Sequence, residues 1–157
     1  MRFLFYDSVI SMEKGKSIVG VKTFPLSEEF YRGHFKKKAI VPGVILIEAM
    51  AQLLGWLIIY THNFRISSIM SLIEDVNIPS DLRPGCKADI HGEIVSTSKR
   101  DSLGRARIYV DRREIAFVNR IIYSHFYKVN PEELEDLFCY YSGVQKERLN
   151  EGYKNGH

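Results

Sequence analysis

A histidine and a glutamate stand close together in the sequence, in a setting that suits acid–base chemistry. His34 precedes a run of lysines, and Glu48 follows it by fourteen positions, inside an otherwise apolar segment. A neutral imidazole can accept a proton near neutral pH, and a carboxyl group kept protonated by apolar surroundings can donate one. Together the two groups suit an elimination, in which one removes the proton next to a carbonyl and the other protonates the departing hydroxyl.

Two further residues of this segment could complete such a site. Gly43 opens the predicted helix, so its backbone N–H would point outward at the positive end of the helix dipole and could stabilise an enolate oxygen. Gln52 lies one turn after Glu48 on the same face and could hold the carboxyl group by a hydrogen bond. In the alternative interpretation, His34 is a structural residue and Glu48 is a buried acid paired with an arginine. The pattern alone does not decide between them.

The segment that contains Glu48 is itself a predicted core helix. Residues 42–60 have the length of a helix and are apolar on nearly every face, which is typical of a helix enclosed by other structure. Pro42 suits the first helical position. A membrane span is the competing interpretation, but Glu48 and Gln52 would each be costly near the centre of a bilayer. We therefore expect no membrane span.

Most of the remaining sequence predicts antiparallel strands. Residues 87–96 alternate between apolar and polar side chains, and Ala106, Ile108 and Val110 are expected to face inward. Turns are expected at residues 13–16, 101–104 and 111–114. The expected strands are residues 8–12, 17–24, 69–78, 87–96, 105–110 and 115–126. One long buried helix followed by such strands requires a sheet that curls around the helix, which is an α+β fold.

The character of the sequence changes at Lys128. A helix-start signal at residues 130–133 is followed by Leu134, Leu137, Phe138 and Tyr141 at helical spacing. We expect a main domain over residues 1–127, a C-terminal extension with one amphipathic helix over residues 128–149, and a disordered polar tail over residues 150–157.

Composition narrows the class of protein. The chain has 157 residues, is 45% hydrophobic and 26% charged, and resembles an ordinary soluble domain. A formal charge of +3 is too small to indicate nucleic-acid binding. Cys86 and Cys139 follow no metal or redox spacing, and His62, His91 and His125 show no ligand-like spacing, so we assign no metal. The apolar run at the start is too short for a signal peptide, which points to the cytoplasm.

Three short motifs carry a resemblance to a known family. They are Gly33-His34-Phe35, Pro42-Gly43-Val44 and Glu48-Ala49-Met50-Ala51-Gln52. Together they closely resemble the signature of the FabZ-type 3-hydroxyacyl-acyl-carrier-protein dehydratases, whose pattern runs G-H-F-P-G-K-P-x-x-P-G-V-x-x-x-E-A-M-A-Q. The resemblance extends over roughly residues 3–126. It implies the hotdog fold, an antiparallel sheet wrapped around one long helix, which agrees with the strands expected above.

The resemblance also implies a role for each motif residue. His34 matches the family's catalytic histidine and Glu48 its catalytic acid. Gly43 matches the glycine whose amide faces the thioester carbonyl, and Gln52 matches the glutamine beside the acid. The related FabA-type enzymes, which also isomerise the double bond, carry aspartate at the position of Glu48, so dehydration without isomerisation is favoured. The implied substrate-binding residues are Gly43, Gln52, Phe35 and Val44.

The partners implied by the resemblance are an acyl carrier protein and a second copy of the chain. The substrate would be carried on the phosphopantetheine of the carrier protein, and no other cofactor is implied. The product would be the trans-2-enoyl thioester, in fatty acid or related polyketide or polyene biosynthesis. The family forms homodimers or dimer-based hexamers in which each active site takes its histidine from one chain and its acid from the other.

The sequence departs from the family pattern in two places. The family's Pro-Gly-Lys-Pro after the His-Phe pair is Lys36-Lys37-Lys38-Ala39 here. The family's arginine-rich strand before the Pro-Gly turn retains only Arg83 in this chain. Because those arginines are thought to dock the acidic carrier, Lys36, Lys37 and Lys38 are candidate replacements. The other interpretation of such a run is a solvated loop.

Two other functions remain open at this point. The hotdog fold also supports acyl thioesterases, in which a water is activated for hydrolysis. The spacing of His34 and Glu48 favours the dehydratase over this chemistry. A non-catalytic acyl-binding subunit is the third interpretation, and the altered loop after Phe35 is the only feature that favours it.

Overall fold

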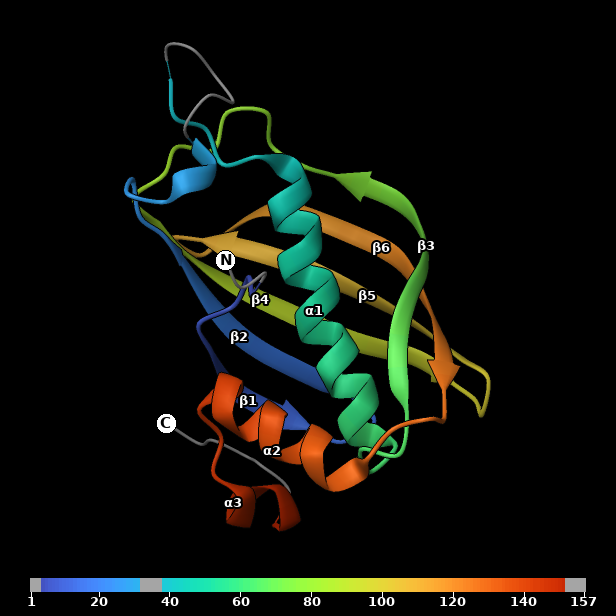
Figure 1. Cartoon of the computed structure of the whole chain (residues 1–157). Coiled ribbons are helices and arrows are strands. Elements are labelled where there is room, and N and C mark those ends of the chain that lie inside the picture. Colours follow the sequence, from blue (N-terminus) through green and yellow to red (C-terminus); the bar gives the residue numbers. More distant parts are fainter. Residues whose placement is uncertain (1–3, 32–37, 152–157) are drawn as a thin grey trace.

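The fold is a six-stranded antiparallel sheet with one long helix packed against it (Figure 1). The computed structural model describes residues 4–31 and 38–151. The strands are β1 (Ser8–Glu13), β2 (Ser17–Phe24), β3 (Ser67–Asn77), β4 (Cys86–Thr97), β5 (Asp101–Val110) and β6 (Arg113–Phe126). Their order is β1-β2-β4-β5-β6-β3, so β1 and β3 are the edge strands. The expected α+β hotdog architecture is confirmed.

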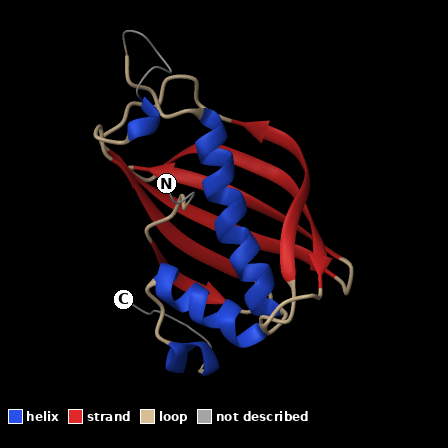
Figure 2. Ribbon diagram, in the orientation of Figure 1, coloured by secondary structure: helices blue, strands red, loops and turns tan. Residues whose placement is uncertain are grey.

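The helix α1 (Gly43–Thr61) runs diagonally across the sheet and supplies much of the core (Figure 2). Leu46, Met50, Leu53, Leu54 and Leu57 are fully buried, which explains why the segment is apolar on nearly every face. The helix is long and apolar enough to cross a membrane, but most of it is buried inside this fold. Its apolarity is therefore accounted for by its place in the core.

The prediction of a turn at residues 101–104 is wrong. Those residues belong to β5, and the chain turns between β4 and β5 at residues 98–100 instead. The backbone N–H of Ser98 donates to the carbonyl oxygen of Asp101 at 2.9 Å, which closes the turn. The next hairpin turns at Asp111 and Arg112, whose φ angles of 49° and 65° match the twist that two-residue hairpins require. The turn expected at residues 111–114 is thus confirmed in a shorter form.

Gly104 is a glycine because the helix comes close to the sheet at this point. A Cβ atom there would lie 2.7 Å from both Leu54 Cδ2 and the carbonyl oxygen of Glu93. A similar contact occurs at Gly20, where a Cβ atom would lie 2.8 Å from Leu53 Cδ1. Such contacts are too short for any side chain, so these glycines let α1 lie close to β2 and β5.

The C-terminal extension forms two helices, α2 (Pro131–Ser142) and α3 (Lys146–Asn150), where the sequence predicted one. The side chain of Asn130 accepts hydrogen bonds from two backbone N–H groups of the first turn and caps α2. Gly143 takes the left-handed conformation, with φ of 72°, and ends it. Of the expected polar tail, Asn150 belongs to α3, and residues 152–157 lie outside the described part of the chain.

Candidate active site

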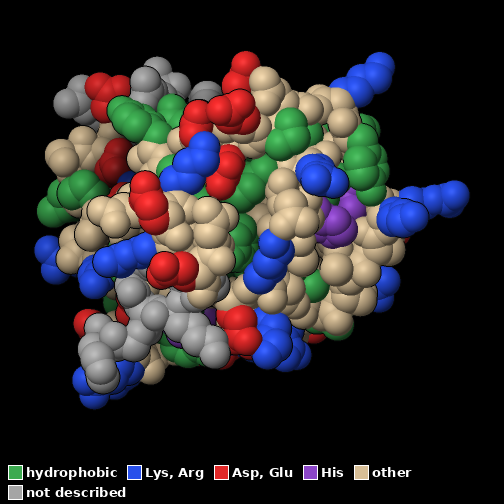
Figure 3. Space-filling model, turned by 90° about the horizontal axis from the view of Figure 1, so that it is seen from below, with side chains coloured by type: hydrophobic (Ala, Val, Ile, Leu, Met, Phe, Trp, Pro, Cys, Tyr) green, Lys and Arg blue, Asp and Glu red, His purple; other side chains and the backbone are tan. Residues whose placement is uncertain are grey.

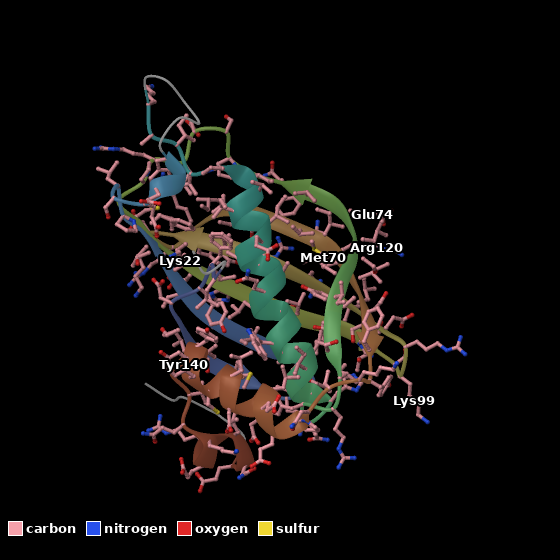
Figure 4. The ribbon with its side chains drawn as sticks, viewed as in Figure 1. Lys22, Met70, Glu74, Lys99, Arg120 and Tyr140 are labelled. Carbon is pink, nitrogen blue, oxygen red and sulfur yellow. The ribbon has the colours of Figure 1, made fainter. Side chains whose placement is uncertain are left out.

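A cavity of about 310 Å³ lies between α1 and β3. Figure 4 shows Met70, which lines it, beside this gap. Strand β3 also contributes Ser68 and Ile69, and β6 contributes Tyr123. The helix lines the cavity with one stripe of side chains at helical spacing. These are Glu48, Ala51, Gln52, Gly55, Trp56 and Ile59. We call this space the Glu48 cavity.

Glu48 is half-buried and is held by a short chain of hydrogen bonds. The amide nitrogen of Gln52 donates to Glu48 Oε1 at 2.8 Å, as the one-turn spacing predicted. The amide oxygen of Gln52 accepts from the backbone N–H of Phe5 at 2.9 Å, which orients the Gln52 amide. Among the residues the structure describes, no arginine forms an ion pair with Glu48. The arginine-paired alternative therefore has no support in the described residues.

Tyr123 and Ser68 are polar residues of the cavity wall that the sequence analysis missed. The Tyr123 hydroxyl donates to the carbonyl oxygen of Ala51 at 2.7 Å, and the Ser68 hydroxyl donates to that of Gly55 at 3.1 Å. Burial, and then the neighbouring Glu48 carboxyl group, raise the pKa of Tyr123 well above its ordinary value. The Tyr123 hydroxyl therefore stays neutral, and its proton is used in the hydrogen bond to Ala51. The alternation along β6 was the only signal that it faces inward.

His34, Phe35, Lys36 and Lys37 lie outside the described residues, so their predicted roles stay predictions. The chain on the N-terminal side of this segment is fixed by Lys22, which is only 8% exposed (Figure 4). Its Nζ atom lies 3.3 Å from Asp7 Oδ1 and 3.5 Å from Glu28 Oε1. Glu28 directly precedes the short 3₁₀ helix η1 (Glu29–Tyr31), so this cluster anchors the start of η1 to β2.

Comparisons with known proteins identify the family of this chain. The model of a family described as the FabA-like domain matches residues 1–118. A 3-hydroxyacyl-[acyl-carrier-protein] dehydratase FabZ of Clostridioides difficile is 31% identical over 109 residues, covering 69% of this chain and 77% of the relative. The FabZ of Caldicellulosiruptor saccharolyticus is 32% identical over 110 residues, covering 69% of this chain and 79% of the relative. The chain belongs to the FabZ-type dehydratase family.

Solved structures share the fold of this FabZ-type chain at much lower identity. The smu.793 protein of Streptococcus mutans, bound to acetyl CoA, has a TM-score of 0.60 at 13% identity, covering 79% of this chain and 91% of that one. A hypothetical thioesterase of Streptococcus pneumoniae with coenzyme A has a TM-score of 0.58 at 13% identity, covering 74% of this chain and 84% of that one. At such identities the likeness concerns the fold alone.

The start of α1 carries two of the FabZ motif residues. The helix begins at Gly43, and Pro42, which was expected at the first helical position, is the extended N-cap residue instead. A Cβ atom at Gly43 would lie 3.0 Å from Ile78 Cγ2. Val41 donates its backbone N–H to the carbonyl oxygen of Leu82 at 2.9 Å, which seats the helix start on the segment after β3. Val44 is 66% exposed and is not part of the Glu48 cavity. Its substrate-binding role stays a prediction.

Lys38 and Arg83, both linked to carrier docking by the resemblance to the family, lie at the same cavity. This second cavity has a volume of about 330 Å³. It is lined by Leu26, Lys38, Ala39, Ile40, Asp81 and Arg83. Lys38, the one residue of the lysine run that the structure describes, thus lies at the same cavity as the arginine left from the FabZ pattern.

Two histidines outside the FabZ motifs also come together. The rings of His62 and His125 lie 4.8 Å apart, and Thr97 and Ser102 link their Nε2 atoms through hydrogen bonds of 2.8, 2.6 and 2.9 Å. Burial lowers the pKa of both histidines. Figure 3 shows histidines gathered beside basic side chains on the face seen from below. Among the described residues, no group of three or more His, Cys, Asp or Glu side chains could hold a metal ion.

Proposed function

We propose that this protein removes water from a 3-hydroxyacyl thioester and releases the trans-2-enoyl thioester. The observation that carries the proposal is Glu48, held by Gln52 at the wall of a cavity that becomes apolar farther along α1. Membership of the FabZ-type family supplies the reaction class, because the relatives are named as 3-hydroxyacyl-[acyl-carrier-protein] dehydratases. The protein is accordingly a hydro-lyase of fatty acid biosynthesis.

The reaction divides between a base and an acid. His34 removes a proton from C2, and the electrons of that C–H bond pass into the enolate of the thioester. The backbone N–H of Gly43, at the positive end of the α1 dipole, stabilises the enolate oxygen. The C2–C3 double bond then forms as the C3–O bond breaks, and the proton from Glu48 leaves with the hydroxyl as water. Gln52 positions Glu48 for this transfer.

The remaining partners follow from the same chemistry. The acyl chain is carried on the phosphopantetheine of an acyl carrier protein, and the enzyme requires no cofactor of its own. We place the reaction in the cytoplasm. The active enzyme is at least a homodimer in which His34 and Glu48 of one site come from different chains.

The decisive assay follows both water loss and thiol release from a carrier-bound 3-hydroxyacyl thioester. We expect an enoyl thioester, seen by its ultraviolet absorption and by the mass of the intact carrier, with the thioester bond preserved. Release of free carrier thiol without loss of water would instead show a thioesterase, as in some proteins of this fold. Binding without either reaction would show a non-catalytic acyl-binding subunit.

The lysine run provides a test of carrier docking. Changing Lys36, Lys37 and Lys38 to serine is expected to raise KM for the carrier-bound substrate, because an acidic carrier loses attraction to the loop. Higher salt should act in the same direction, since exposed charges are screened beyond about 10 Å at 0.1 M ionic strength. The control substrate is the same acyl group on pantetheine alone, without the carrier protein. An equal effect on both substrates would mean that the loop shapes the site and does not dock the carrier.

A further inference from the structure

The C-terminal extension packs directly behind one wall of the Glu48 cavity. The family model ends at residue 118, so α2 and α3 lie beyond the part matched to the family. Phe138 of α2 is fully buried, and its ring centroid lies 5.2 Å from that of Trp56, with the ring planes tilted by 46°. Trp56 in turn lines the Glu48 cavity. The indole therefore lies between the extension and the cavity.

Several other contacts fix the extension to the last turns of α1. The Phe138 ring also lies 5.8 Å from the ring of Phe64, which follows α1. The hydroxyl of Tyr60 donates to the carbonyl oxygen of Leu149 in α3 at 3.1 Å, and Leu149 is itself buried. Figure 1 shows that α2 begins beside this end of α1 and runs in front of β1. On the side away from the cavity, the Trp56 ring therefore packs against Phe138.

The Glu48 cavity changes in character along α1. Glu48 and Gln52 provide a carboxyl group and an amide, and farther along the same stripe the helix contributes Gly55, Trp56 and Ile59. The Ser68 hydroxyl, on the β3 side at this level, is committed to the carbonyl oxygen of Gly55. Trp56 follows Glu48 by two helical turns, a rise of about 12 Å along the helix axis. If the 3-hydroxyl group lies at Glu48, the part of the described cavity that suits the apolar tail of the substrate is the part with Trp56 and Ile59.

We propose that the C-terminal extension sets the length of acyl chain that the enzyme accepts. Phe138 holds the Trp56 ring against the apolar end of the cavity, and acyl chains that extend past this ring are rejected. The inference rests on the proposed dehydration, since it takes the reacting hydroxyl group to lie at Glu48. A hydrophobic pocket discriminates by roughly 10- to 200-fold for each methylene that it excludes, so one held ring is enough to produce a sharp limit.

The test compares variants on two faces of α2. Phe138→Ala removes the ring behind Trp56, and Phe138→Leu leaves a smaller apolar side chain in its place, which keeps the helix attached. Tyr140→Ala is the matched control, because its ring is on the same helix but is 75% exposed (Figure 4). The measured quantity is kcat/KM for 3-hydroxyacyl thioesters of increasing chain length.

We expect both Phe138 variants to raise kcat/KM for long chains, relative to short ones, by at least about 10-fold. The Tyr140→Ala control is expected to show the same dependence of kcat/KM on chain length as the unchanged enzyme. If Phe138→Ala does not fold, Phe138→Leu decides the question. A folded Phe138→Leu variant with an unchanged chain-length profile would overturn the inference, as would an equal shift in Tyr140→Ala.

A second measurement does not depend on turnover. Trp56 is the single tryptophan of the chain, so its emission reports directly on the cavity wall. Saturated acyl-pantetheine thioesters lack the 3-hydroxyl group and can be titrated without reaction. Long chains are expected to change the emission of the Phe138→Leu variant at lower concentration than that of the unchanged protein. The same shift without dehydration of any substrate would refute the proposed function, but it would still show that Phe138 limits the length of acyl chain that the cavity binds.

Discussion

Replacing Glu48 with glutamine is expected to lower kcat/KM for dehydration by about 100- to 10,000-fold. The amide cannot give the departing hydroxyl a proton, although it has nearly the size of the carboxyl group. Its oxygen can still accept the hydrogen bond from Gln52, so the link to the Phe5 backbone should survive. Steady-state kinetics would measure the loss, and thermal unfolding would show whether the fold is retained.

The control for this change is Glu93→Gln, which makes the same substitution at an exposed position on β4. It is expected to leave kcat/KM unchanged. His34→Ala should cause a loss as large as that in the Glu48 variant, because the base is as necessary as the acid. Near-normal turnover in either the His34 or the Glu48 variant would contradict the acid–base pair.

The overall fold could be predicted from the sequence because hydrophobic patterning dominates its elements. The helix expected at residues 42–60 is observed at Gly43–Thr61, and all six expected strands are present. The error at residues 101–104 has a clear cause. A local pattern treats Gly104 as a turn residue, whereas its requirement for glycine comes from Leu54, which lies far away in the sequence. A prediction made from neighbouring residues in the sequence cannot include the contact between Gly104 and Leu54.

The candidate site was predictable only where its residues lie on one element. The one-turn spacing of Glu48 and Gln52 gave their hydrogen bond correctly, since both stand on α1. Tyr123 and Met70 reach the same cavity from β6 and β3, and these two residues are directly paired in the sheet register. That pairing depends on how two distant strands align. The contact between Trp56 and Phe138 depends in the same way on how the extension docks.

The edge of the sheet suggests how the site is completed. Strand β3 is an edge strand and exposes Ile69, Leu72 and Val76 to the extent of 55%, 43% and 37%. An exposed apolar edge of this kind is suited to pairing with a second copy of the chain. Ile69 also lines the Glu48 cavity, so a chain bound at this edge would lie beside Glu48. A partner there could bring its own His34 to the site.

Mixing His34→Ala and Glu48→Gln subunits is therefore expected to restore activity from two inactive proteins. Random pairing makes half of the dimers mixed, and each mixed dimer holds one site with both changes and one with neither. About a quarter of all sites should then be active. The measurement is the rate per site after co-expression or joint refolding, with each variant treated alone as the control. If each site were contained within one chain, every site would carry a change and no activity would return. Absent recovery after proven subunit exchange would thus exclude the shared site, yet it would leave the roles of His34 and Glu48 in the chemistry untouched.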